Sequence, residues 1–346
     1  MTAPAPKLIV ILGPTATGKT KLAAALAFKY GGKIISADSR QVFCGMDIGT
    51  GKDLADYYIS SELAQKLKSS KRPASVKSGL KPAQAASDKA SGTAIRGHQD
   101  SSKVPYALID IIEPMTAFNV AKYQKLAKKA IGEAVSQGYQ PFLVGGTGLY
   151  IDAIIKGYQF NQEISAEKQK QVRNKLDKLS LTRLLARLKK VDPITYQKID
   201  QKNRRRVQRA LEIYEATGRR KSETDKKSGS DYDLLIIGLK FSLEEIYRRI
   251  DSRLETRIKE GMIKEIKKLR RQGVSWKRLE EFGLEYRYVS RYLRGLISYE
   301  EMLGQLKNEI HHFAKRQLTW FKRNKDIVWV TKPREAERAI AGFLKK

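Results

Sequence analysis

The sequence is poor in cysteine and histidine. Its 346 residues include one cysteine, Cys44, and three histidines. A single thiol cannot form a disulfide within the chain, and so few thiolates and imidazoles cannot build a cysteine-rich zinc cluster. We therefore expect neither a disulfide-stapled secreted domain nor a zinc-binding module.

Long apolar runs are also missing. No stretch approaches the roughly 20 apolar residues that cross a bilayer, and the run Leu8–Leu12 is too short for the core of a secretory signal. A hydrophobic fraction of 41% still suffices for a substantial core in one or two domains. We predict a cytoplasmic protein outside the membrane, and nothing in the sequence requires more than a monomer.

Acidic residues are scarce relative to basic ones. Lysine and arginine number 68 against 37 aspartates and glutamates, which gives a net charge of +31. Such an excess creates a positive field that attracts polyanions, nucleic acid above all. The alternative is that the charge serves solubility alone, so the placement of the basic residues has to decide.

A phosphate-binding motif follows the first apolar run. Residues 13–20 read GPTATGKT, which matches the pattern G-x-x-x-x-G-K-[ST]. The glycines let backbone amides approach phosphate oxygens, Lys19 reaches the terminal phosphate, and the Thr20 hydroxyl ligates Mg²⁺. The motif lies between an apolar run typical of a buried strand and an Ala/Leu-rich stretch, Lys21–Tyr30, typical of a helix. We therefore predict a P-loop that holds a di- or triphosphate; taken alone, it suggests ATP and phosphoryl transfer.

Short apolar runs alternate with helical patterns along the rest of the chain. The predicted helices include Val120–Ser136, and the further predicted strands are Lys33–Ala37, Ala107–Ile112, Pro141–Val144, Leu234–Leu239 and Ile327–Val330. Strands that alternate with helices predict an α/β fold with a parallel sheet. We expect a P-loop NTPase-like sheet flanked by helices, with an inserted helical subdomain.

Two segments interrupt this alternation. Residues 53–103 are rich in serine, lysine, alanine and glycine, which predicts a flexible basic insert, either a solvated loop or a weak tether for nucleic acid. Residues 161–200 are dense in charge and carry a narrow leucine stripe, which predicts an inserted helical subdomain. The remainder, 1–160 and 201–346, is predicted to be the P-loop catalytic core.

Polar residues follow several of the predicted strands. Asp38 comes at the end of the second strand, within ISADSRQVF, and VGGTGLY, which contains Thr147, ends another. The carboxyl ends of parallel strands face the ligand crevice in open α/β sheets. Asp38 is thus predicted to face the P-loop, where it could ligate Mg²⁺ or accept a proton; the alternative is a carboxylate that caps the following helix.

Two basic arrays suit contacts with nucleic acid. They are NRRRVQRALEIYEATGRR at 203–220 and KRQLTWF at 315–321. Basic residues that alternate with amides and aromatics fit phosphate contacts combined with base contacts or stacking. Each array could instead be a charged helix face over a core. The long amphipathic stretch that contains Arg253 and Arg257 has the same two readings, a solvated surface or a phosphate clamp.

These motifs together resemble the tRNA dimethylallyltransferase (tRNA isopentenyltransferase) family. GPTATGKT, DSRQVF, GMDIGTGK, VPYALIDI, VGGTGLY, RRRVQRALEIYEATG and AKRQLTWF occur in the family's order, from the P-loop to about Val330. The resemblance implies transfer of a dimethylallyl group from dimethylallyl diphosphate to N6 of the adenine 3′ of the anticodon (position 37), in tRNAs that read codons beginning with U. The implied cofactor is Mg²⁺, and the implied partner is the tRNA anticodon stem-loop, which the helical subdomain at 161–200 would help to bind.

The resemblance also implies roles for individual residues. Asp38, Lys19, Thr20 and Arg253 would be catalytic, with Thr20 as the metal ligand and a flipped adenine oriented by Asp38. The diphosphate would lie on Gly13, Pro14, Thr15, Ala16, Thr17, Gly18, Lys19 and Thr20. The tRNA would contact Asp38, Ser39, Arg40, Gln41, Thr147, Arg173, Arg205, Arg206, Val207, Gln208, Arg209, Lys315, Arg316, Gln317 and Trp320, with a weaker match near Phe282–Tyr286.

Three departures from the family pattern accompany the match. Tyr106 and Ala107 stand where the family often has two histidines, the basic insert lengthens a connection that is usually short, and no Cys/His zinc finger follows the core, which points to the bacterial type. Three rival functions remain open from the residues: a small-molecule kinase, an adenylate isopentenyltransferase that takes a free nucleotide, and a non-catalytic nucleic-acid-binding module.

Overall fold

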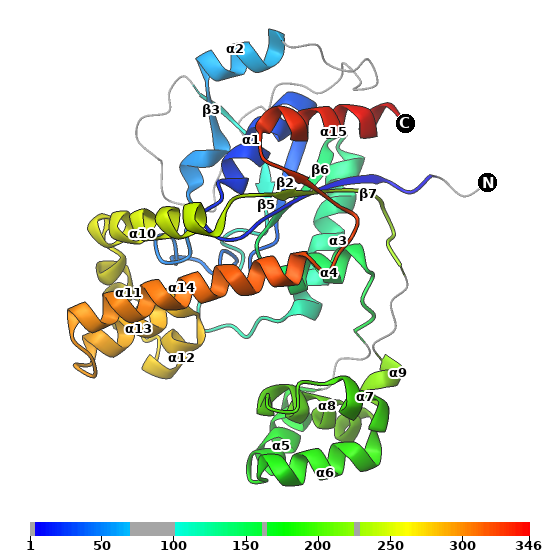
Figure 1. Cartoon of the computed structure of the whole chain (residues 1–346), viewed down its shortest axis with the longest axis vertical. Helices are drawn as coiled ribbons and strands as arrows, with labels where there is room; N and C mark the ends of the chain where they lie inside the picture. Colours follow the sequence, from blue (N-terminus) through cyan, green and yellow to red (C-terminus); the bar gives the residue numbers. More distant parts are fainter. Residues whose placement is uncertain (1–3, 70–100, 161–164, 225–228) are drawn as a thin grey trace. The chain divides into compact units, whose positions relative to one another are not determined.

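The computed structural model describes residues 4–69, 101–160, 165–224 and 229–346. Within these ranges the chain divides into two compact units: unit 1 comprises 1–155 and 231–346, and unit 2 comprises 156–230. Figure 1 shows both units in colours that follow the sequence. None of the helices among the described residues is long and apolar enough to cross a membrane.

Unit 1 is built on a parallel six-stranded sheet. Its order is β5-β2-β6-β1-β7-β8, with β1 (Lys7–Leu12) and β6 (Gln140–Gly145) in the middle. The other strands are β2 (Gly32–Ser36), β5 (Tyr106–Ala107), β7 (Asp233–Leu239) and β8 (Ile327–Val330). Five of the six strands expected from apolar runs are present close to the predicted bounds, because such runs are buried on both faces of a covered parallel sheet. The strand predicted at Ala107–Ile112 is wrong beyond its first residue, because Leu108 and Asp110 have positive φ angles that end β5 at Ala107.

Helices cover both faces of this sheet. On one face, α1 (Lys19–Tyr30) and α15 (Pro333–Lys345) pack against alternate residues of β1, such as Ile9 and Ile11. On the other face, α3 (Val120–Ser136) and α4 (Gly148–Ile155) pack against Leu8 and Val10. The predicted α/β class is confirmed, and α3 has the predicted bounds.

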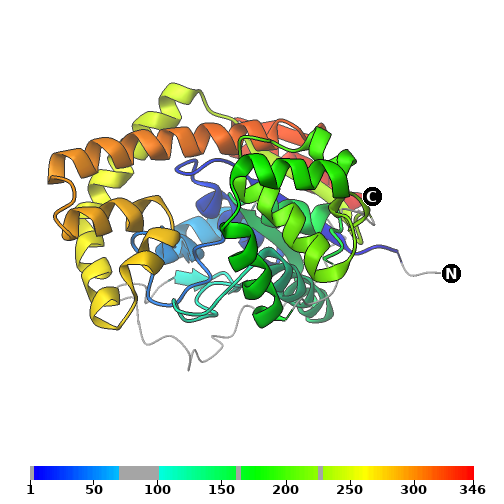
Figure 2. The ribbon, with the colours of Figure 1, turned by 90° about the horizontal axis from the view of Figure 1, so that it is seen from below.

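A layer of helices extends unit 1 beyond the carboxyl ends of the strands. It contains α10 (Leu243–Glu260), α11 (Met262–Arg271), α12 (Trp276–Glu281), α13 (Leu284–Leu293) and α14 (Tyr299–Phe321). The apolar stripe Ile246, Ile250 and Leu254 of α10 is buried with Leu306 and Ile310 of α14. In Figures 1 and 2, α14 runs alongside α10. One face of each helix is buried in this core, which leaves side chains on the other face to contribute to a site.

The predicted insert at 53–103 is partly wrong. Its first residues form a short 3-10 helix, Leu54–Tyr57, and then β3 (Tyr58–Ser60) and α2 (Ser61–Ser69). β3 pairs antiparallel with β4 (Ser101–Lys103), and Tyr57 and Ile59 are buried in the core beside α1. Aromatic and aliphatic side chains at this end bury enough apolar surface to order the backbone. Residues 70–100 lie outside the described residues.

Unit 2 is a small helical bundle. Its helices are α5 (Ala166–Asp177), α6 (Leu181–Val191), α7 (Pro193–Lys198), α8 (Arg204–Thr217) and α9 (Lys221–Thr224). Leu176, Leu184 and Leu188 form one core with Val207 and Leu211 of α8. The predicted boundary at residue 200 is therefore wrong, because α8 buries its apolar face inside the helical unit, which continues to Ser230.

Candidate active site at the carboxyl end of the sheet

The P-loop connects β1 to α1 with a backbone suited to anions. Ala16 and Gly18 have positive φ angles of 63° and 71°, and α1 begins at Lys19 with no side-chain cap on its N-terminus. Such a turn directs successive amides toward one point at the positive end of a helix dipole. Thr17 is buried, and its hydroxyl donates to the Pro14 carbonyl oxygen at 2.8 Å, which braces the loop from within.

A buried glutamine ties the P-loop to the neighbouring strand. Gln317 of α14 accepts a hydrogen bond from the Thr15 amide at 2.9 Å and donates to the Gly146 carbonyl oxygen at 2.7 Å. Its side chain is only 8% exposed, so both ends of the amide are used inside the protein. The predicted contact of Gln317 with tRNA stays a prediction, but its side chain already braces the P-loop from inside the protein. The surrounding pattern KRQLTWF gave no signal for an internal brace.

Asp38 lies at the end of β2, within reach of the P-loop charges. Its Oδ1 accepts from the backbone amides of Arg40 at 2.8 Å and Gln41 at 3.4 Å, while the Thr147 hydroxyl oxygen accepts from the Ser39 amide at 3.1 Å. These bonds hold Asp38, half-buried, at the carboxyl ends of β2 and β6. The structure thus brings Asp38, Ser39 and Thr147 together, as the sequence predicts.

The two residues after Ser39 have different surroundings. The Gln41 amide accepts from the Ser36 hydroxyl at 3.0 Å and donates to the Gly51 carbonyl oxygen at 3.0 Å, so it links two loops of the protein. Arg40 is half-buried, and burial lowers the pKa of its guanidinium, while Asp38 partly offsets this. Both have internal neighbours, so neither is a freely exposed tRNA contact.

Basic side chains surround the P-loop. The Lys19 ammonium donates to the Pro14 carbonyl oxygen at 3.2 Å, and Arg253 of α10 approaches the Thr15 hydroxyl at 3.5 Å and the Gly51 carbonyl oxygen at 3.4 Å. Burial, followed by the positive charge of Arg253, lowers the pKa of Lys19 to about 8, although Asp38 acts in the opposite direction. A lysine with a lowered pKa beside an arginine marks a place where an anion would be stabilised.

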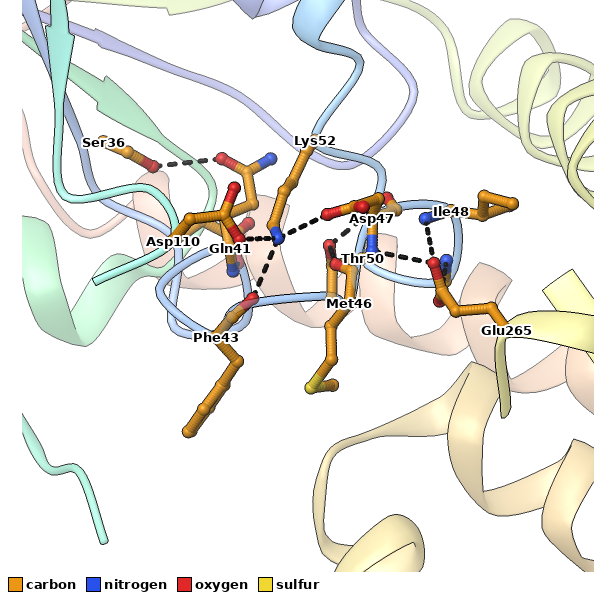
Figure 3. A network of polar contacts seen from close by, with 12 residues as sticks. Ser36, Gln41, Phe43, Met46, Asp47, Ile48, Thr50, Lys52, Asp110 and Glu265 are labelled. Carbon is orange, nitrogen blue, oxygen red and sulfur yellow. Dashed lines mark hydrogen bonds and ion pairs between the residues drawn. The ribbon is translucent and has the colours of Figure 1, made fainter. Parts of the chain in front are cut away.

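The glycine-rich turn at 46–52 is held by a polar network that the sequence did not reveal. Lys52 is 1% exposed, and its ammonium donates to the Phe43 carbonyl oxygen at 2.8 Å and to Asp47 at 2.6 Å, and it also pairs with Asp110. Figure 3 shows these three partners converging on the Lys52 nitrogen. A buried ammonium with three partners is well satisfied, so it fixes this turn against the strand ends.

Glu265 of α11 also binds the backbone of this turn. Its carboxylate accepts from the amides of Asp47 at 2.8 Å, Ile48 at 2.7 Å and Gly49 at 3.1 Å (Figure 3). The Tyr286 hydroxyl donates to the same carboxylate at 2.7 Å. The positions of Gly51 and its carbonyl oxygen therefore depend on the buried Lys52 and the half-buried Glu265, and only the glycines of this segment carry a sequence signal.

The other predicted tRNA contacts of unit 1 lie on α14. Lys315 and Arg316 are exposed. Trp320 is half-buried, and its indole nitrogen donates to Asp152 at 3.1 Å, so it packs against α4. Lys315 and Arg316 are accessible to a ligand, whereas Trp320 is largely part of the core.

The predicted contacts of unit 2 are of two kinds. Arg205 and Arg206 are exposed on the first turn of α8. Val207 is fully buried and Gln208 donates to Asp177 at 2.8 Å with 7% exposure, so a direct contact of either with tRNA is wrong. Helical periodicity explains the error, because consecutive positions on a helix cannot all face the ligand.

A buried glutamate organises two further arginines of unit 2. Glu212 is 3% exposed and accepts from Arg173 at 2.9 Å and from Arg209 at 3.0 Å. The hydrogen bond and the charge of Glu212 raise the pKa of Arg173. Two residues predicted from separate helices therefore lie side by side, and the sequence gave no indication that one carboxylate joins them.

The fold and the site together define a P-loop protein with a cationic phosphate site and a carboxylate beside it. The model of the IPP transferase family matches residues 90–324, and that of isopentenyl transferases matches residues 6–85. The tRNA dimethylallyltransferase 1 of Syntrophus aciditrophicus is 38% identical over 93% of each chain, and the tRNA dimethylallyltransferase of Pelotomaculum thermopropionicum is 38% identical over 93% of this chain and 90% of its own. The chain belongs to the tRNA dimethylallyltransferase family.

Solved structures agree with this assignment. The tRNA isopentenylpyrophosphate transferase of Bacillus halodurans is 33% identical, with a TM-score of 0.63 over 98% of this chain and 97% of its own. A eukaryotic dimethylallyltransferase crystallised while acting on tRNA has a TM-score of 0.70 at 23% identity, over 97% of this chain and 78% of its own, and supports the fold alone. The resemblance inferred from the motifs is confirmed.

Proposed function

We propose that this protein transfers a dimethylallyl group from dimethylallyl diphosphate to N6 of adenine 37, next to the anticodon, in tRNAs that read codons beginning with U. The product is N6-dimethylallyladenosine. One observation carries the proposal: a P-loop with Lys19 and Arg253 lies at the same sheet edge as the half-buried Asp38, close enough for their charges to interact. A small-molecule kinase could use such a carboxylate, but it has no use for two basic arrays.

In this reaction the P-loop holds a leaving group. The bond between the allylic carbon and the diphosphate oxygen breaks with its electron pair on the diphosphate, and the carbon bonds to N6 of adenine. Negative charge grows on the diphosphate while positive charge develops on the hydrocarbon. The amides of residues 15–20, with Lys19 and Arg253, stabilise the diphosphate more strongly as its charge increases, which is electrostatic catalysis.

Asp38 acts on the nucleophile. Its Oδ1 is fixed by two backbone amides, so the carboxylate is oriented before the substrate arrives. It accepts a hydrogen bond from the adenine N6 amine and takes the proton that the amine loses as the C–N bond forms. Because this amine is a weak nucleophile, orientation matters at least as much as basicity. The adenine has to leave its stack to reach Asp38, as in other enzymes that modify a base.

Mg²⁺ fits the donor set of this site. Among the residues that the structure describes, no group of three His, Cys, Asp or Glu side chains could hold a metal. Mg²⁺ needs few protein ligands when a substrate supplies phosphate oxygens, with water for the rest. The Thr20 hydroxyl, in the first turn of α1, and the diphosphate oxygens would hold the ion, which would neutralise part of the leaving group's charge.

The tRNA is bound through exposed basic side chains. Arg205 and Arg206 on α8, and Lys315 and Arg316 on α14, are the exposed members of the two basic arrays. They suit the phosphates of an anticodon stem-loop, a contact that depends on charge and therefore on salt. The net charge of +31 supports this assignment. We place the reaction in the cytoplasm, where the tRNA substrate is found.

The test is a transfer assay with labelled dimethylallyl diphosphate, Mg²⁺ and either unmodified tRNA or AMP. We expect label in the tRNA, at the adenine next to the anticodon, and none in AMP. Label in AMP alone would make the protein an adenylate isopentenyltransferase. No transfer to either acceptor, with ATP consumed in the presence of a small acceptor, would contradict the proposal and favour the kinase alternative.

A further inference from the structure

A second arginine of α10 lies beside the site and is incompletely paired. Arg257 is one turn beyond Arg253 and is only 8% exposed. Its Nη2 has no hydrogen-bond partner among the described residues, and Nη1 lies 3.7 Å from Glu285, too far for a hydrogen bond. A buried charge with one distant partner is costly, so a purely structural role explains the arrangement poorly.

Gly51 fixes the direction of this guanidinium. A Cβ at Gly51 would lie 1.5 Å from Nη2 of Arg257 and 2.4 Å from Nη2 of Arg253. Both nitrogens therefore approach the same point and lie within about 4 Å of each other, where like charges away from water repel strongly. Residue 51 also has a positive φ of 62°, so glycine is favoured there both by space and by backbone conformation.

Two carboxylates offset this repulsion only in part. Arg253 is shared between Asp53, the Gly51 carbonyl oxygen and the Thr15 hydroxyl. Glu285 lies 3.7 Å from Nη1 of Arg257, and Asp53 attracts Arg257 less strongly. Burial, and then the charge of Arg253, lowers the pKa of Arg257, and Arg257 in turn contributes to the lowered pKa of Lys19. The positive charges of Lys19, Arg253 and Arg257 therefore repel one another beside the P-loop.

We propose that Arg257 binds the diphosphate together with Arg253 and Lys19. Glu285 partly neutralises the positive charge of Arg257. A diphosphate carries several negative charges and many acceptor oxygens, so one such anion satisfies both guanidinium groups and removes their mutual repulsion. The proposal rests on the proposed function only for the identity of the anion. It makes Arg257 a specificity residue for diphosphate over monophosphate, because a single phosphoryl group on the P-loop offers fewer oxygens.

Three variants test the proposal by calorimetric titration with inorganic diphosphate and, separately, with inorganic phosphate. Arg257→Met removes the charge at similar length, Glu285→Gln removes its counter-charge, and Arg248→Met removes an exposed charge from the same helix as a control. We expect Arg257→Met to weaken diphosphate binding by about 10-fold or more, Glu285→Gln to tighten it, and Arg248→Met to change it less than about 2-fold, as for a screened surface charge. Binding of inorganic phosphate should change less in every variant.

Two results would overturn the proposal. One is an Arg257→Met variant that binds diphosphate as the Arg248→Met variant does. The other is a change in the same direction for Arg257→Met and Glu285→Gln, which is what a structural ion pair predicts. If Arg257→Met does not fold, Arg257→Lys and Glu285→Gln decide by the same criterion. A wild-type protein that binds diphosphate but does not prenylate tRNA would contradict the proposed function and leave this inference intact.

Discussion

The basic side chains around the P-loop of unit 1 differ in exposure from the two arginines on the first turn of α8 in unit 2. Around the P-loop, Lys19, Arg253 and Arg257 are half-buried or buried. Lys19 and Arg253 make internal hydrogen bonds, and Arg257 lies 3.7 Å from Glu285. On α8, Arg205 and Arg206 are exposed. A buried charge is strengthened by the low local dielectric and must be positioned, whereas exposed charges act through their number and are screened by salt.

This difference predicts two kinds of mutational effect. Changes in the P-loop site should alter the chemical step or the affinity for diphosphate, with effects that depend on geometry and hardly on salt. Changes on α8 should alter tRNA affinity by small, salt-dependent amounts and leave catalysis at saturating tRNA unchanged.

Asp38→Asn should have the largest effect. The amide keeps the size of the side chain but cannot accept the proton of the adenine amine, so kcat should fall by about 10²- to 10⁴-fold. Filter binding should give nearly the same tRNA affinity. Asp231→Asn, an exposed carboxylate paired with Lys128, is the control and should retain full activity. Transfer that survives within a few-fold in Asp38→Asn would refute the role of Asp38 as base and orienter.

Lys19 should make diphosphate binding depend on pH. Its pKa in the free protein is lowered to about 8, and only the protonated form attracts the anion. Affinity should therefore be complete below pH 8 and decline as the pH rises through 8, by up to about tenfold per unit.

The measurement is titration calorimetry with inorganic diphosphate between pH 7 and 9.5, compared with Lys19→Met. Titration of the ligand itself is common to both proteins, so the difference between the two profiles reports on Lys19. Profiles that run parallel through this range would mean that another group titrates.

Gln317→Leu should destabilise the conformation of the P-loop without removing a group that we assign to the diphosphate. It leaves the Thr15 amide and the Gly146 carbonyl oxygen without their partner, at a cost of about 1–3 kcal/mol. We expect KM for dimethylallyl diphosphate to rise by about 10-fold. Gln305→Leu, the same change at an exposed position of α14, is the control. If Gln317→Leu instead changes tRNA affinity alone, the original assignment of Gln317 to the tRNA would be restored.

Arg206→Ala should have the smallest effect. Loss of one phosphate contact should weaken tRNA binding a few-fold and reduce the slope of log K against log salt by about 0.9 or less. Arg334→Ala, an exposed arginine of α15, serves as the control. A salt slope for Arg206→Ala equal to that of the wild type would assign the face of α8 to a solvated surface.

Most of the sheet, the P-loop and the order of the motifs follow from the amino-acid sequence alone. The apolar run Leu8–Leu12 directly before GPTATGKT favours a buried strand, and GPTATGKT in that context has few uses other than phosphate binding. Placement of Asp38 near the P-loop also followed, because the carboxyl ends of parallel strands lie at one edge of a sheet. These inferences rest on local pattern and on general rules of topology.

The tertiary structure was needed to tell which residues of the basic motifs make contacts inside the protein. Gln317 lies in a motif that reads as nucleic-acid binding, yet both ends of its side chain are used by residues 15 and 146. Val207 shares a basic motif with Arg206 but faces the core, and Glu212 joins two arginines from different helices. Such contacts join residues far apart in the chain, so spacing carries no trace of them.

The same reason applies to the two arginines of α10. Their spacing of one helical turn is compatible with either a solvated face or a clamp, and the sequence left both readings open. The approach of the Gly51 backbone, held in place by Lys52 and Glu265, made this face a buried one. Burial makes an incompletely paired guanidinium costly, and Glu285 at 3.7 Å pairs with Arg257 incompletely, which is why we assign a diphosphate to it.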